Sequence, residues 1–333
     1  MTPTSRSFDT FQDAYIAHLV DVRDQPEFRN APRGCQSRET LGISYRLLNP
    51  RERVVRCRIR RSNLVFNFAE VLWYLSGRDC LDQIEFYAPT MRNYSADGKV
   101  LTGTAYGPRI FDFGFANIDQ WNSIIRTLRE DPDSKRAMIQ IFTPEELLIE
   151  ANIDVACTIG LQYMIREGEL HAVTFMRAND AFRGAVSDVF SFTFLQELLA
   201  HQLGLQLGTY THVAGSYHLY AADDARADEL LADTTDEVSE APFPRMPDGD
   251  NWPAIREVLA IEQSIRTGRV ALGRSKIESL QIDPYWQQIV GLFALYGQLR
   301  FGPRVDEELL DFLTPLYSSM FTNVWDLSAM PPV

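Results

Sequence analysis

Residues 160–176, GLQYMIREGELHAVTFM, contain two short apolar runs separated by the polar turn REGE. The runs 160–165 and 170–176 are rich in aromatic and β-branched residues and flank a glycine, which is the pattern of a β-hairpin. The stretch 187–203, SDVFSFTFLQELLAHQL, is long and apolar enough for a buried helix, and Ser187 is its predicted N-cap. A hairpin followed by a long helix, without regular βαβ alternation, predicts an α+β fold.

Further elements are expected on both sides of this core. Helices are predicted over 8–20, 64–76, 117–130 and 216–232, and strands over 51–61, 136–142 and 207–214. The polar stretch 22–40 contains Pro26 and Pro32 and is predicted to be a loop. The acidic segment 234–253 contains four prolines. We expect it to be a surface excursion of a single domain that spans 1–333.

The composition is that of a globular, acidic protein. Of the 333 residues, 45% are hydrophobic and 11% are aromatic, which supplies a core and excludes a disordered chain. The chain has 32 basic and 45 acidic residues, so its formal net charge is −13. A field of this sign opposes approach to a nucleic-acid backbone, although one or two phosphates could be held locally. We therefore expect small-molecule partners and no nucleic acid.

Several other classes of protein are disfavoured. No apolar run reaches the roughly 18–20 residues needed to cross a bilayer, and Met1–Asp9 lacks the apolar stretch of a secretory signal. A cytoplasmic protein with no membrane partner is therefore expected. The four cysteines form no CxxC pair and have no histidine at ligand spacing, so individual thiols and no metal site are expected. Neither a GxGxxG nor a Walker motif occurs.

Three features could carry chemistry. Cys157 lies between apolar segments, where a lone cysteine most often contributes packing. As a nucleophile it would need a nearby cation to lower its pKa, and Arg177 on the adjacent predicted strand could do this while binding a phosphate. Glu70 is the single acid of an apolar helix, where an unpaired carboxylate is costly. The arginine-rich strand 51–61 is compatible with a solvated edge or with an anion-facing surface.

Ordered motifs surround these residues. They are DPDSKR (131–136), VACTIGLQ (155–162), RANDAFRGAVSD (177–188) and THVAGSYHLY (211–220), with EVLWYLSG (70–77) and AYG (105–107) upstream. Through these motifs the chain resembles the thymidylate synthases, from roughly Arg33 to Tyr220. The resemblance implies a large mixed sheet packed with helices, with one sheet face used for homodimerisation. It also implies transfer of one carbon from 5,10-methylenetetrahydrofolate to C5 of a pyrimidine nucleoside monophosphate.

The resemblance assigns roles to individual residues. Cys157 would be the nucleophile that adds to C6 of the pyrimidine and makes C5 reactive. Glu70, with a raised pKa, would organise proton transfer, and Tyr106 and His218 would help to order that network. Taken alone, a histidine in the position of His218 is more commonly a hydrogen-bonded core residue. The implied nucleotide contacts are Arg33 (or Arg38), Lys135, Arg136, Gln162, Arg177, Ala178, Asp188, His218 and Tyr220, with Lys135 and Arg136 supplied by the partner subunit. The implied folate contacts are Asp180, Gly184 and Arg60.

Asp188 is the main departure from the thymidylate synthase pattern. Enzymes that act on dUMP have asparagine at this place, whose amide donates to O4 and accepts from N3–H of uracil. Cytosine reverses that pattern, and a protonated aspartate can accept from its N4 amino group while donating to N3. A carboxylate near a helix start also has a purely structural explanation. Given the surrounding motif, we expect Asp188 to select cytosine and to share in catalysis.

Smaller departures bear on the sugar and on the product. Ala178 replaces a serine and Lys135 an arginine, and both changes reduce bulk and could admit a 2′-hydroxyl. Thr158 replaces the histidine that usually follows the nucleophile. No tryptophan occurs over 85–105, and Met91 or Tyr94 is expected in its place. A wetter pocket favours water over hydride as the final reactant.

These departures are most similar to the cytidylate hydroxymethylase branch of the family, which includes enzymes of mildiomycin-type nucleoside antibiotic synthesis. The predicted reaction converts CMP to 5-hydroxymethyl-CMP. The alternatives are a dCMP hydroxymethylase and a divergent thymidylate synthase that methylates dUMP and releases dihydrofolate. A further alternative is a catalytically silent nucleotide- or RNA-binding relative that uses 51–61.

Overall fold

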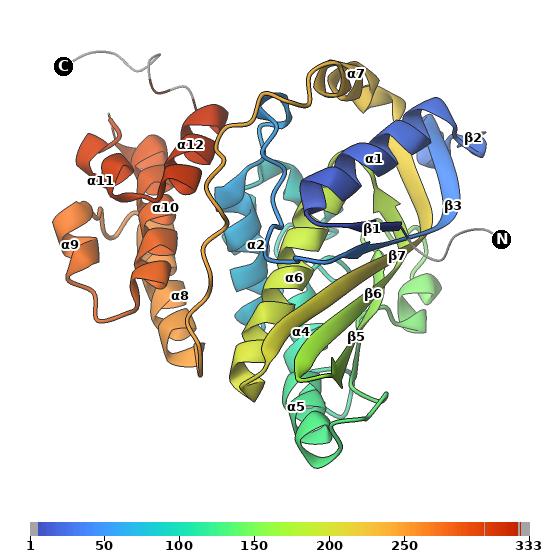
Figure 1. Ribbon diagram of the computed structural model, residues 1–333, viewed down its shortest axis with the longest axis horizontal. Helices are drawn as coiled ribbons and strands as arrows, with labels where there is room; N and C mark the ends of the chain where they lie inside the picture. The colour runs from blue at the N-terminus through green and yellow to red at the C-terminus, as the bar shows by residue number, and fades with distance from the viewer. Residues whose placement is uncertain (1–5, 303, 326, 328–333) are drawn as a thin grey trace.

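A mixed seven-stranded sheet forms the centre of the protein (Figure 1). The computed structural model describes residues 6–302, 304–325 and 327. The strand order is β1-β3-β7-β6-β5-β4, with β2 on the outer part of β3. The strands are β1 (Arg6–Phe8), β2 (Phe28–Asn30), β3 (Ser37–Leu47), β4 (Met138–Gln140), β5 (Thr158–Arg166), β6 (Glu169–Asp180) and β7 (Gln206–Tyr220). The pairs β1–β3 and β6–β7 are parallel and the others antiparallel, so the predicted α+β class is confirmed.

The predicted hairpin is the β5–β6 pair. Arg166 pairs with Glu169, and the two residues between them, Glu167 and Gly168, both have positive φ values, of 53° and 82°. Positive φ at both central positions is the conformation of a type I′ turn, which matches the twist of the two strands. The local sequence was therefore sufficient to predict this hairpin.

Helices cover one face of the sheet in two layers. The helices are α1 (Phe11–Asp24), α2 (Leu64–Leu75), α3 (Leu81–Glu85), α4 (Tyr106–Phe111), α5 (Gln120–Glu130), α6 (Gly184–Leu203), α7 (Asp224–Ala232), α8 (Trp252–Arg266), α9 (Arg274–Glu278), α10 (Pro284–Phe301), α11 (Glu307–Phe312) and α12 (Pro315–Val324). The central helix α6 packs on β6 and β7, and α2 packs on α6. The C-terminal helices α10 and α12 in turn pack on α2 (Figure 1). None of the helices in the described ranges is both long and apolar enough to cross a bilayer.

The two faces of the central strands differ in burial. In β6, Leu170, Ala172 and Met176 are buried, whereas Val173 and Phe175 on the alternate face are half-buried. The period of two follows from strand geometry, in which successive side chains point to opposite faces. One face therefore packs against α6, and the other presents apolar side chains that this chain covers only in part.

The arginine-rich stretch 51–61 is not a strand, which corrects the sequence prediction. It is an irregular segment ending in a 3₁₀ turn, Arg58–Arg60. Its arginines are held by acids distant in sequence or one turn away: Arg51 and Arg53 by Glu197, Arg56 by Glu52, and Arg58 by Asp236. In a strand these arginines would have alternated with apolar residues along one exposed face, whereas here each of them forms an ion pair. The RNA-binding alternative requires these arginines to be free to contact phosphates, but the ion pairs neutralise their charge.

Three predicted boundaries are also wrong. Helix α6 begins at Gly184, before Ser187, because the Asp180 side chain accepts the amides of Phe182 and Arg183 (both 2.8 Å) and starts the turn earlier. The strand predicted over 207–214 continues to Tyr220 along β3, so the following helix starts only at Asp224. The predicted loop 22–40 contains the end of α1, all of β2 and the start of β3, because β2 and β3 form a second hairpin.

The segment between α7 and α8 runs along the molecule between α6 and the C-terminal helices (Figure 1). It has no helix, and its one recorded β-bridge joins Glu237 to Cys57. Phe243 and Met246 are buried, and the Met246 amide donates to Glu197 (3.3 Å). These contacts fasten the segment to the core. The terminal residues Met330–Val333, which could close over a ligand, lie outside the described residues.

Candidate active site

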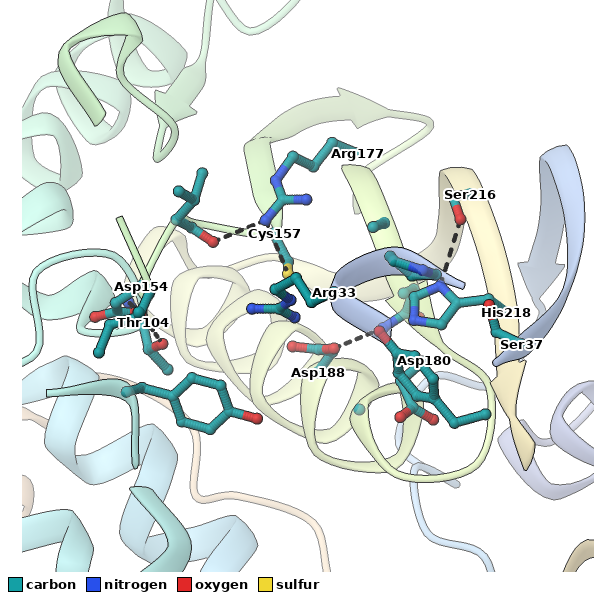
Figure 2. Close-up of a pocket in the computed structure, with 18 of the residues that line it drawn as sticks. Arg33, Ser37, Thr104, Asp154, Cys157, Arg177, Asp180, Asp188, Ser216 and His218 are labelled. Carbon is teal, nitrogen blue, oxygen red and sulfur yellow. Dashed lines mark hydrogen bonds between the residues drawn. The ribbon is translucent and has the colours of Figure 1, made fainter. Parts of the chain in front are cut away.

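A cavity of about 890 Å³ opens at the C-terminal ends of β6 and β7, beside the first turns of α6 (Figure 2). Most of the residues predicted from sequence line it. They are Arg33, Glu70, Tyr106, Cys157, Arg177, Ala178, Asp180, Gly184, Asp188, His218 and Tyr220. The fold therefore brings together side chains from segments separated by up to about 190 positions.

Cys157 lies just before β5 and beside a guanidinium group. Its Sγ is 3.6 Å from Nη2 of Arg177 (Figure 2). Arg177 is fixed there because it also donates to the carbonyls of Ala156 (2.8 Å) and Val155 (2.9 Å). Burial raises the pKa of the Cys157 thiol, and the Arg177 charge opposes that rise without cancelling it. Cys157 therefore rests as a thiol at neutral pH.

Glu70 is a buried acid on α2 at the inner end of the cavity. Its Oε2 accepts a hydrogen bond from Ser191 (3.1 Å). Burial, with a further contribution from the nearby Asp188, raises the pKa of Glu70 to about 8. At neutral pH the carboxyl group therefore carries a proton and can act as a donor.

Tyr106 connects the start of β5 to helix α2. Its hydroxyl accepts from Thr158 Oγ1 (3.0 Å), and its ring stacks on Tyr74, one turn after Glu70, with centroids 4.9 Å apart. The next residue, Gly107, permits this approach, since a Cβ there would lie 2.8 Å from the Tyr74 carbonyl oxygen. Thr158 thus fixes a tyrosine beside the proposed acid.

Asp188 lies half-buried in the second turn of α6. Its Oδ2 accepts from Asn179 Nδ2 (2.7 Å), and Asn179 Oδ1 lies 3.0 Å from His212 Nε2. Burial raises the pKa of Asp188 to about 7, so that the acid and the carboxylate are both populated at neutral pH. Among the described residues no group hydrogen-bonds to Oδ1, which leaves that oxygen available to a ligand.

His218 and Tyr220 form the end of the cavity contributed by β7. Their rings meet edge to face with centroids 4.9 Å apart. Burial lowers the pKa of His218, which favours the neutral imidazole. Burial raises the pKa of Tyr220, and the neighbouring Arg33 guanidinium opposes that rise. Arg33 occupies a 3₁₀ turn, Pro32–Gly34, with a φ of 53°.

Four predicted contacts lie outside this cavity. Gln162 donates to the Lys135 carbonyl (2.9 Å) and does not line the cavity, because it pairs with Val173 on the sheet face that helices do not cover. Arg136 has a side chain that is 80% exposed. Arg60 donates to the Tyr15 hydroxyl and the Phe182 carbonyl. Lys135 and Arg136 were expected to serve the partner subunit and stay predictions.

For two predicted contacts the sequence left a choice between two residues, and the structure shows which of them line the cavity. Arg38 pairs with Asp224 outside the cavity, so Arg33 is the arginine that reaches the site. Either Met91 or Tyr94 was expected in place of the family's tryptophan. Both residues, in the 3₁₀ turn Pro89–Tyr94, line the cavity.

Sequence reasoning missed several polar residues of the cavity. They are Asn30, Ser37, Glu39, Thr104, Asp154, Asn179 and Ser216. Asp154 accepts from the amides of Gly103 (2.8 Å) and Thr104 (2.9 Å) and so holds that loop against the segment that leads to Cys157. Asn179 and Ser216 lie inside motifs quoted above, which was a signal that they face the site. Glu39 gave no such signal, because the start of β3 fell within the predicted loop 22–40.

Comparison with known proteins agrees with the position of this site. A family model described as thymidylate synthase matches residues 13–249, which include every cavity residue named above. Three curated relatives are named deoxyuridylate hydroxymethyltransferase.

The relative from Bacillus phage SP01 is 29% identical over 205 residues, covering 58% of this chain and 53% of its own. The relative from Pseudomonas phage M6 is 31% identical over 175 residues, covering 52% and 49%. The relative from Delftia phage PhiW-14 is 32% identical over 201 residues, covering 57% and 55%. The chain therefore spans about half the length of the curated relatives it matches.

Proposed function

Because the chain belongs to the thymidylate synthase family, we propose that it hydroxymethylates C5 of CMP, with 5,10-methylenetetrahydrofolate as the one-carbon donor. The products would be 5-hydroxymethyl-CMP and tetrahydrofolate. The observation that carries the choice of base is Asp188, whose half-buried carboxyl group lines the cavity and has a pKa raised to about 7. The names of the three relatives support hydroxymethyl transfer.

Cys157 performs the first step. Its sulfur adds to C6 of the pyrimidine and loses its proton, which pushes electron density to C5. C5 then bonds to the methylene carbon that the folate supplies as an electrophile. Loss of the C5 proton and cleavage of the bond between that carbon and the folate nitrogen release tetrahydrofolate and leave an exocyclic methylene on the ring. Addition of water to the exocyclic carbon and elimination of the Cys157 thiolate give the hydroxymethyl product. Glu70, protonated at neutral pH, is placed to pass protons to and from the ring.

Asp188 recognises the base by hydrogen bonding. In its acid form it donates to N3 of cytosine and accepts from the N4 amino group, whereas uracil would meet a donor opposite N3–H. A buried polar group left unpaired in this way costs roughly 1–3 kcal/mol, which is enough to decide between two substrates. Hydroxymethylation of dUMP is the second candidate, favoured by the names of the relatives.

The cavity has the features that a folate would need. Met91, Tyr94, Leu147 and Ile153 supply apolar and aromatic surface to its lining, and the Asp180 carboxyl group lies in the same cavity. A flat heterocycle requires such a surface, and its amino-pyrimidinone edge pairs with a carboxylate. Asp180 is therefore the residue we assign to that edge, with the apolar side chains contacting the remainder of the molecule.

The active form is proposed to be a homodimer. The half-buried Val173 and Phe175 lie on the sheet face that helices do not cover, which is an apolar surface a second copy could bury. Lys135 and Arg136 lie outside the cavity of their own chain. Delivery of these two cations to the partner's phosphate site would explain their position.

The experiment that tests the function presents CMP, dCMP, UMP and dUMP separately, each with the folate, and identifies the products by mass. The expected result is 5-hydroxymethyl-CMP with no release of dihydrofolate. Formation of dTMP with dihydrofolate would establish the thymidylate synthase alternative instead. Hydroxymethylation of uracil nucleotides alone would contradict the assignment of Asp188.

The sugar preference has its own test. Ala178→Ser combined with Lys135→Arg restores the side chains of dUMP-specific enzymes and adds bulk near the ribose and phosphate. We expect the ratio of kcat/KM for CMP to that for dCMP to fall by about 10-fold, since a single steric or polar contact is worth about that much. An unchanged ratio would reject the role of these two positions.

A further inference from the structure

A four-residue polar cluster lies at the His218 end of the cavity. Asn30, Ser37, Glu39 and Ser216 all line the cavity, and no role has been assigned to them above. Glu39 is central, because its Oε1 accepts from Ser216 Oγ and its Oε2 accepts from Asn30 Nδ2 (2.6 Å). Ser37 Oγ donates to Asn30 Oδ1, so the Asn30 amide is oriented with its NH₂ group toward Glu39.

The sheet register places this cluster beside the predicted sugar contacts. Glu39 on β3 pairs directly with His218 on β7, and Ser216 pairs directly with Ala178 on β6. Directly paired residues have Cβ atoms about 4.5–5.5 Å apart on the same side of a sheet. Ser216 also lies 3.3 Å from His218 Nδ1 (Figure 2). The carboxylate is therefore next to the histidine, and its partner Ser216 is next to the alanine that replaces serine.

The chemistry of the cluster fits neutral hydroxyl groups. A carboxylate repels a phosphate, and Arg33 and Arg177 provide the positive charge for that group elsewhere in the cavity. Each carboxylate oxygen has about two lone pairs, and Ser216 and Asn30 use one on each oxygen. The remaining lone pairs can accept from the two hydroxyls of a ribose, as acidic residues do for the ribose of dinucleotides.

We propose that Glu39, oriented by Ser216 and Asn30, binds the 2′-hydroxyl of the nucleotide and is the residue that selects ribose over deoxyribose. This inference rests on the proposed function. It goes beyond that proposal because the small Ala178 only makes room for a 2′-hydroxyl, whereas Glu39 supplies a partner for it. With a deoxynucleotide the space left beside Glu39 contains no donor, and the carboxylate loses a charge-assisted hydrogen bond.

The test compares Glu39→Gln and Ser216→Ala with a matched control. Glu27→Gln is the control, because the Glu27 carboxylate accepts from the β3 amide of Leu41 (3.0 Å) but lies outside the cavity. The readout is the ratio of kcat/KM for the ribonucleotide to that for the deoxynucleotide, together with the dissociation constants of both nucleotides by calorimetry. A ratio within one sample is independent of the fraction of folded enzyme.

We expect Glu39→Gln to lower the ratio by about 10–100-fold, mainly by weakening ribonucleotide binding, because a hydrogen bond to a charged group is lost. Ser216→Ala should lower it by a smaller factor, and Glu27→Gln should leave it within about twofold. Equal losses for the two sugars in Glu39→Gln would overturn the inference and assign Glu39 a structural role.

Failure of the Glu39 inference can be distinguished from failure of the proposed function. The comparison is made with whichever base the wild type accepts, so an error about cytosine does not affect it. A wild-type preference for deoxyribose overturns both this inference and the CMP assignment. A wild-type preference for ribose that survives in Glu39→Gln overturns this inference alone.

Discussion

Cys157→Ala is expected to lower turnover by about 10⁴-fold or more, because removal of a covalent nucleophile leaves only binding and orientation to accelerate the reaction. The variant should still bind the nucleotide, since Arg33, Arg177 and Asp188 remain in the cavity. Two measurements check this result. One is the rate of product formation, and the other is exchange of the C5 proton of CMP for deuterium, which requires addition of sulfur to C6.

Cys80→Ala provides the matched control. Cys80 is also a free, half-buried thiol, but it lies outside the cavity. Turnover and exchange should both stay close to wild type. Retention of either activity in Cys157→Ala would exclude the covalent mechanism and would favour a nucleotide-binding protein without this chemistry.

The parts of the fold that were predicted correctly have short-range causes. The β5–β6 hairpin follows from two apolar runs and a glycine turn, and α2 follows from an apolar run that ends before Gly77. The parts that were wrong depend on distant residues. The stretch 51–61 is irregular because Glu197 and Asp236 pair with its arginines. No local pattern contains that information.

The candidate site shows the same division. Motifs identified Cys157, Asp188 and His218, and the structure places all three in one cavity. Gln162 lies in a motif but points away from the cavity, because strand alternation and register decide its direction. Glu39 enters the cavity only through the pairing of β3 with β7, which joins residues about 180 positions apart. Tertiary register is therefore the part of the site that the sequence alone did not reveal.

Asp188→Asn is expected to exchange the preferred base. The amide donates to O4 and accepts from N3–H of uracil, and it can serve cytosine only with its two ends reversed. The ratio of kcat/KM for the cytosine nucleotide to that for the uracil nucleotide should fall by about 100-fold, since two buried polar contacts become mismatched for one base and matched for the other. The measurement is a competition assay with both nucleotides present and the products resolved by mass.

The same substitution changes the pH dependence. The acid form of Asp188 is the proposed donor to N3. Because burial raises its pKa to about 7, binding of CMP to the wild type should weaken as the pH rises through about 7. An asparagine does not titrate, so nucleotide binding to Asp188→Asn should lack that loss. The nearby Glu70, whose pKa is about 8 in the wild type, also titrates, and because Asp188 contributes to that rise the substitution should lower the pKa of Glu70 as well. Identical curves and an unchanged base ratio would show that this carboxyl group does not face the pyrimidine, and the relatives' uracil substrate would then be the better assignment.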